Sequence, residues 1–67
     1  MGHRHQWSFS YTRTANGGAL NFYKCPDCDY RRMEAVFGAR RKTWVFHKSG
    51  TGEKLVEGLE WLSGWSV

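Results

Sequence analysis

The chain has 67 residues, of which 40% are hydrophobic and 24% charged, and it carries a net charge of +4 at pH 7. This length excludes a multidomain architecture, and no apolar run approaches the roughly 18 residues needed to span a membrane. A core of this size seldom supplies more than about 3–5 kcal/mol, so such a small domain usually needs a metal or a disulfide. We therefore expect one domain, residues 1–67. Because the N-terminus lacks a signal-like apolar segment, we expect the protein in the cytoplasm and away from membranes.

The charge is unevenly distributed along the chain. Residues 1–48 carry nine of the ten lysines and arginines against three acidic residues, which gives this segment a net charge of +6. Residues 49–67 carry one lysine against three glutamates, a net charge of −2. A basic body followed by an acidic segment is a more specific pattern than a uniformly basic protein.

The first 24 residues have the pattern of a β-hairpin. Aromatic and polar side chains alternate with a period of two, which predicts a half-buried strand. Asn16-Gly17 predicts a two-residue turn, so that Tyr11 faces Phe22 and His5 faces Cys28. In the same register Phe9 faces Lys24. Four rings of this hairpin are expected in the core: Trp7, Phe9, Tyr11 and Phe22.

The remaining segments predict a second hairpin and a helix. Residues 29–37 and 42–47 are expected to be strands joined by a turn at Gly38-Ala39, which places His47 opposite Tyr30. Residues 51–64 are expected to form a helix with Thr51 as its N-cap and Gly58 as a weakening residue. Its apolar stripe consists of Leu55, Val56, Leu59 and Leu62. The expected fold is therefore a small α+β domain with an antiparallel sheet of three or four strands and a C-terminal helix.

Cys25-Pro-Asp-Cys28 is the most informative motif of the chain. Two thiolates and two imidazoles form a typical tetrahedral Zn²⁺ site, and His3 and His5 lie one hairpin upstream. His47 is the alternative to His3 as the fourth ligand. A disulfide or a redox pair is the other interpretation of the cysteines, although the flanking segments indicate strands rather than a redox helix. A bound structural zinc contributes on the order of 10–16 kcal/mol of apparent folding free energy.

These residues resemble a zinc ribbon, a family of small antiparallel domains built on metal-binding turns. The resemblance covers about residues 3–36 and depends on His3-x-His5-x-Trp7 followed by Tyr23-x-Cys25-x-x-Cys28. It is similar to short bacterial and phage proteins of this type, although His3 replaces a usual cysteine and Asp29 a frequent glycine. It implies a zinc-stabilised, zinc-ribbon-like fold with a sheet and metal site over 3–48.

The basic and aromatic residues indicate binding rather than catalysis. No catalytic zinc pattern is present, so we expect no enzyme activity. Five cations are expected to contact nucleic acid: Arg31, Arg32, Arg40, Arg41 and Lys42. Tyr23 and Tyr30 are candidates for stacking on unpaired bases. Trp61 and Trp65 either pack over the sheet edge or anchor a protein partner. The alternative function is a protein-interaction module, such as a small phage-type regulator or inhibitor docking on RNA polymerase or a CRISPR nuclease.

Overall fold

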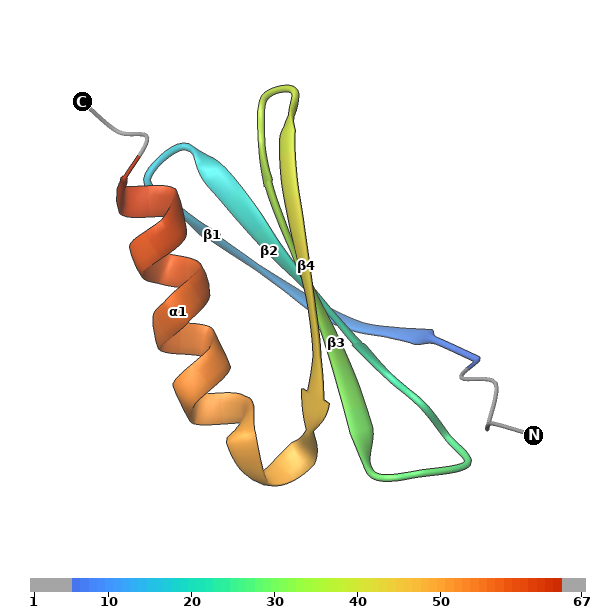
Figure 1. Ribbon diagram of the computed structural model, residues 1–67. Coiled ribbons are helices and arrows are strands. Elements are labelled where there is room, and N and C mark those ends of the chain that lie inside the picture. Colours follow the sequence, from blue (N-terminus) through green and yellow to red (C-terminus); the bar gives the residue numbers. More distant parts are fainter. Residues whose placement is uncertain (1–5, 65–67) are drawn as a thin grey trace.

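The computed structural model describes residues 6–64, which form a four-stranded antiparallel sheet with a helix against one side (Figure 1). The strands pair in chain order and are β1 (Ser8–Ala15), β2 (Gly18–Lys24), β3 (Tyr30–Phe37) and β4 (Arg40–His47). A short 3-10 helix, η1 (Lys48–Gly50), leads into α1 (Thr51–Ser63). The predicted sheet and C-terminal helix are thus confirmed as an α+β fold. Within residues 6–64 no helix is long and apolar enough to cross a membrane.

The turn between β1 and β2 follows directly from its two residues. Asn16 and Gly17 have φ values of 52° and 84°, and both therefore occupy the left-handed region. Asparagine and glycine tolerate that region, and two such residues give the turn the twist that a two-residue hairpin needs. Tyr11 pairs with Phe22, as the sequence predicted.

A β-bulge at Ser10 changes the register of β1 before that residue. Phe9 pairs with Tyr23, whereas the uninterrupted pattern predicted Lys24 as its partner. Because side chains alternate between the two faces of a strand, one extra residue sends Phe9 to the face opposite Tyr11. The prediction that both rings lie in the core is wrong, since Phe9 is 60% and Tyr11 47% exposed.

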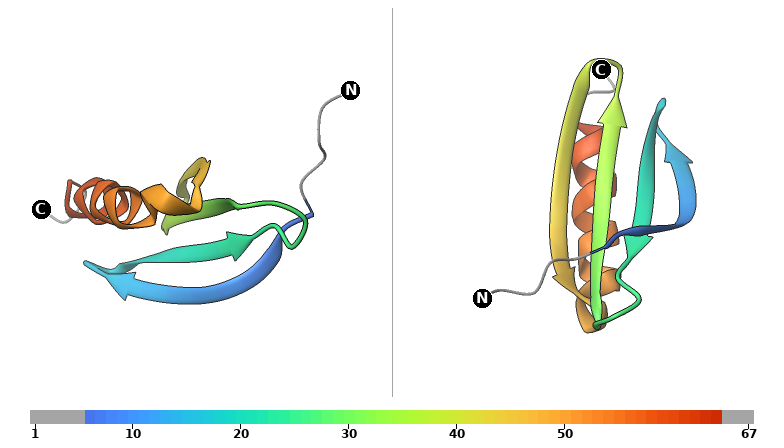
Figure 2. Two further views of the ribbon diagram at one scale, coloured as in Figure 1. Left: turned by 90° about the horizontal axis from the view of Figure 1, so that it is seen from below. Right: turned by 90° about the vertical axis from the view of Figure 1, so that its right-hand side faces the viewer.

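The core lies between the sheet and α1. Its buried residues come from β2, β3, β4 and the helix: Leu20, Phe22, Met33, Ala35, Phe46 and Leu62. The helix packs mainly on β3 and β4, and Figure 2 shows it behind these two strands with β1 farthest away. Tyr30 pairs with His47, as predicted for the second hairpin. Val56 was expected on the apolar stripe of the helix but is 53% exposed.

Gly58 has a packing role that the sequence did not indicate. It is buried in the middle of α1, and a Cβ at this position would lie 2.9 Å from Leu20 Cδ2 and 2.8 Å from Met33 Cε. The missing side chain therefore lets the helix backbone approach the sheet closely. A glycine expected only to weaken the helix is a contact point between the two layers.

The start of α1 also differs from the prediction. Gly50 occupies the N-cap position without a side-chain hydrogen bond, and the Thr51 hydroxyl donates to the Lys48 carbonyl at 2.8 Å. His47 caps the preceding η1, because its Nδ1 accepts a hydrogen bond from the Ser49 amide at 3.2 Å. The connection from β4 to the helix is therefore fixed by His47 rather than by a threonine cap.

Candidate functional site

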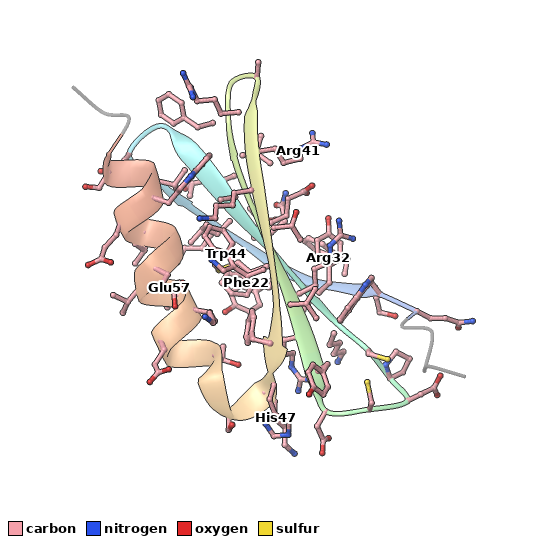
Figure 3. All side chains as sticks on the ribbon, in the orientation of Figure 1. Phe22, Arg32, Arg41, Trp44, His47 and Glu57 are labelled. Atoms are coloured by element: carbon pink, nitrogen blue, oxygen red, sulfur yellow. The ribbon has the colours of Figure 1, made fainter. Side chains whose placement is uncertain are left out.

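The helix covers one face of the sheet, and no other element of the described chain covers the opposite face, which we call the open face. Strand alternation and the register place ten side chains on its central part: Phe9, Thr12, Asn21, Tyr23, Tyr30, Arg32, Glu34, Arg41, Thr43 and Val45. Figure 3 shows Phe22 and Trp44 between the sheet and α1, with Arg32 and Arg41 on the other side. The open face is thus a mixture of rings, cations and small polar groups.

The five cations that the sequence predicted as one basic surface are divided between the two faces. Arg32 and Arg41 lie on the open face, whereas Arg31, Arg40 and Lys42 occupy positions in register with the core residues. The Lys42 ammonium lies over the Trp44 ring, 5.2 Å from its centroid. Adjacent residues of a strand point to opposite faces, so consecutive arginines cannot share one flat surface.

Three side chains form a continuous row across the open face. Phe9 pairs with Tyr23, and Tyr23 pairs with Arg32 on the next strand. The rings of Phe9 and Tyr23 meet edge to face with centroids 5.8 Å apart, and the Arg32 guanidinium carbon lies 5.3 Å from the Tyr23 centroid. Aromatic pairs and cation–π contacts at these distances are attractive, so the row is held by its own contacts.

A polar network occupies the part of the open face nearer the β1–β2 turn. Thr12 donates to Asn21 Oδ1 at 2.8 Å, and Asn21 Nδ2 donates to Glu34 Oε1 at 3.5 Å. Glu34 Oε2 pairs with Arg41 Nε at 3.4 Å, and the Glu34 side chain is only 14% exposed. Arg41 is therefore largely neutralised by Glu34, which leaves Arg32 as the cation of the open face without a carboxylate partner in the described chain.

The cysteine turn, residues Cys25–Cys28, connects β2 to β3. Cys25 is buried, Cys28 is partly exposed, and neither forms a disulfide. The Cys28 amide donates to the Cys25 carbonyl at 3.4 Å, and the Cys25 amide donates to the Tyr30 carbonyl at 3.2 Å. The Asp29 carbonyl accepts from the Lys48 amide at 2.8 Å, which ties the turn to the end of β4. Both sulfurs are consequently held at one end of the sheet.

The electrostatics of the two thiols do not favour a redox role. Partial burial and the hydrogen bond with Cys25 raise the pKa of the Cys28 thiol above its ordinary value of 9.0. Redox-active Cys-x-x-Cys pairs have a thiol with a lowered pKa, commonly at a helix N-terminus. Here the pair lies in a turn between two strands, and the raised pKa keeps the Cys28 thiol protonated at neutral pH.

The remaining predicted metal ligands are only partly within the described chain. His3 and His5 lie outside residues 6–64, as does Trp65. His47 lies within them, but its Nδ1 faces Ser49 Oγ at 2.9 Å, and it does not form a metal-sized group with Cys25 and Cys28. Over the described residues no three His, Cys, Asp or Glu side chains gather closely enough to hold a metal ion. The donor set available in this part of the chain is therefore the thiol pair.

The outer surface of α1 is acidic and partly apolar. Lys54 and Glu57 form an i, i+3 ion pair, with Lys54 Nζ 2.8 Å from Glu57 Oε2. The hydrogen bond from Lys54 lowers the pKa of the Glu57 carboxyl below its ordinary value of 4.5. Trp61, predicted as a partner contact, is partly buried against the core cluster. This placement matches the sheet-packing alternative for Trp61 more closely than a fully exposed anchor.

Comparisons with known proteins assign neither a family nor a function to the chain. No family model matches the chain, and no curated protein or solved structure is significantly similar to it. The site is therefore defined by its own geometry. Two open-face residues were not predicted as functional: Phe9, which was expected in the core, and Val45. The strand period would have placed Val45 beside Arg32, but no local signal marks the bulge that exposes Phe9.

Proposed function

We propose that the protein binds nucleic acid through the open face of its sheet. The observation that carries this proposal is an uncovered sheet surface on which exposed rings adjoin an arginine without a carboxylate partner. Rings stack on bases, while guanidinium groups attract phosphate and stack on bases as well. Arg32 and Arg41 are the predicted cations on this face, and Arg40 and Lys42 add positive charge near the β3–β4 turn.

The charge distribution supports the same orientation. The sheet-bearing segment, residues 1–48, has a net charge of +6, whereas residues 49–67 have a net charge of −2. Within α1 the glutamates Glu53, Glu57 and Glu60 are exposed. A polyanion is therefore attracted to the sheet and repelled by the outer surface of the helix. Repulsion by the glutamates of α1 makes the side of the sheet that the helix does not cover the more favourable side for a polyanion.

We also propose that Cys25 and Cys28 bind a structural zinc ion together with His3 and His5. The two thiols lie in one turn, and β1 starts opposite Lys24, at the same end of the sheet. His5 precedes the start of β1 by three residues, which is a short distance along the chain. Zinc bound there would connect β1 to the cysteine turn and stabilise the end of the sheet that carries Tyr30, without a catalytic role.

A salt titration tests the nucleic-acid proposal. Fluorescence anisotropy of labelled mixed-sequence DNA and RNA, in single-stranded and duplex forms, measures affinity as the KCl concentration rises. Direct phosphate contact predicts a linear fall of log affinity with log salt. Absence of binding to every probe at low salt, or affinity that does not change with salt, would contradict the proposal. That result would favour the protein-interaction alternative.

A further inference from the structure

We infer that the open face is specific for single-stranded nucleic acid and binds it mainly by base stacking. This inference rests on the proposed nucleic-acid function and adds the class of ligand. It follows from three observations on the open face: the row that contains Phe9, Tyr23 and Arg32, a second ring pair beside it, and a small net charge.

The row has the dimensions of a stacking platform. Val45 of β4 pairs with Arg32 and so extends the row of Phe9, Tyr23 and Arg32 across all four strands. Neighbouring strands lie about 4.8 Å apart, so the row extends over about 14 Å. Phe9 is 60% and Val45 53% exposed, and both therefore project above the sheet at opposite edges. The Tyr23 ring and the Arg32 guanidinium lie between them, so successive bases can contact several flat surfaces.

A second ring pair extends the platform toward the cysteine turn. Tyr30 lies on the open face two residues before Arg32, a separation of about 6.6 Å along β3. It is 41% exposed, and the His47 ring meets it edge to face at 5.7 Å. The contact of His47 Nδ1 with Ser49 fixes the orientation of the imidazole. The open face therefore carries two pairs of rings, Phe9 with Tyr23 and Tyr30 with His47.

The small net charge of the open face favours a single strand over a duplex as its ligand. Duplex binding without base readout depends on neutralising several phosphates. Here Arg41 pairs with Glu34 at 3.4 Å, so Arg32 contributes most of the uncompensated positive charge that the described residues place on the open face. Base stacking contributes more per contact than a single exposed cation does, but it requires bases whose faces are not already stacked in a duplex. The surface therefore suits unpaired bases.

The first test compares two aromatic residues of β1 that lie on opposite faces. Anisotropy is measured with labelled oligothymidylate, with oligouridylate and with a DNA duplex of equal length. The wild-type chain is expected to bind a single strand at least about tenfold more tightly than the duplex, and the two single strands distinguish DNA from RNA. Phe9→Ser is expected to weaken single-strand binding about tenfold. Tyr11→Ser, which removes an exposed ring from the other face, is expected to leave it within about twofold.

The second test compares two arginines and does not depend on removing a ring. Arg32→Gln and Arg13→Gln each delete one positive charge, but Arg13 lies on β1 opposite Leu20, on the core side of the sheet. Arg32→Gln is expected to weaken single-strand binding about tenfold and to reduce the salt slope by about 0.7. Arg13→Gln is expected to change affinity no more than about twofold. Circular dichroism verifies that each variant is folded.

The outcomes separate this inference from the proposed function. Equal affinity for duplex and single strand, or equal effects of Arg32→Gln and Arg13→Gln, would overturn the stacking inference while leaving nucleic-acid binding in place. Loss of binding by all probes would overturn both. Retention of wild-type affinity by folded Phe9→Ser would show that the row is not the binding surface.

Discussion

Replacing Gly58 with alanine tests how closely α1 packs against the sheet, and so which face of the sheet is covered. A Cβ there would lie 2.8 Å from Met33 Cε, 2.9 Å from Leu20 Cδ2 and 3.1 Å from Met33 Sδ. Carbon atoms attract one another best near 3.5–4.0 Å, so the neighbouring side chains must shift. Leu20 and Met33 are both fully buried, and neither can move into solvent.

Two opposing effects determine the magnitude. Alanine is favoured over glycine in a helix interior by about 1 kcal/mol. Adding a methyl group to a packed core costs about 1–3 kcal/mol. The flexible end of Met33 absorbs part of the clash, so we expect Gly58→Ala to lower the free energy of unfolding by about 1 kcal/mol. For a domain of this size that corresponds to a fall in Tm of about 4–8 °C.

The matched control is Gly52→Ala in the first turn of the same helix. No atom lies within 4 Å of the Cβ position at Gly52, so only the helix preference applies. We expect Gly52→Ala to raise the free energy of unfolding by about 0.5 kcal/mol. Urea unfolding followed by circular dichroism measures both. Stabilisation of the protein by Gly58→Ala to the same degree as by Gly52→Ala would refute the close contact between helix and sheet.

Three further predictions concern the zinc proposal, the open face and the pH dependence. Cys25→Ser removes a proposed ligand, so bound zinc should fall from about one ion per chain to none and a chelator should no longer change the Tm. One equivalent of zinc retained by Cys25→Ser would contradict the ligand set. Glu34→Gln releases Arg41 and removes the carboxylate of the open face, so single-strand affinity should rise about two- to fivefold in the anisotropy assay, and unchanged affinity would argue against this surface. Since Lys54 lowers the pKa of Glu57, the stabilising contribution of this pair is present above the ordinary value of 4.5 and is lost as the pH falls below it. Lys54→Met should therefore reduce the change in Tm between about pH 6 and about pH 3, and an unaltered pH profile would exclude the contribution.

The elements of the fold could be predicted where local chemistry determines them. Asn16-Gly17 specifies its turn because both residues tolerate positive φ, and the pairing of Tyr11 with Phe22 follows. The helix was expected over 51–64 and spans Thr51–Ser63. The bulge at Ser10 could not be predicted, since it inserts one residue without any marker in the alternating pattern. The bulge moves Phe9 to the open face, whereas Tyr11 keeps its predicted register and is exposed on β1, the strand farthest from the helix.

The candidate site could be predicted in part. Tyr23, Tyr30 and Arg32 were identified as possible contacts to nucleic acid, and the structure places them on one face. The five cations were expected to act together, but strand alternation divides them, and Arg41 is paired with Glu34 by a contact between neighbouring strands. Contacts of this kind depend on the register across the sheet, which composition alone does not determine.

The central claim is that the uncovered side of the sheet binds unpaired bases. Methyl NMR tests it most directly, because Val45 lies on the open face and Val56 on the helix, and both are 53% exposed. Adding oligothymidylate to ¹³C-methyl-labelled protein should shift the Val45 resonances progressively and leave those of Val56 in place. Shifts confined to Val56, or equal shifts at both valines, would contradict the account.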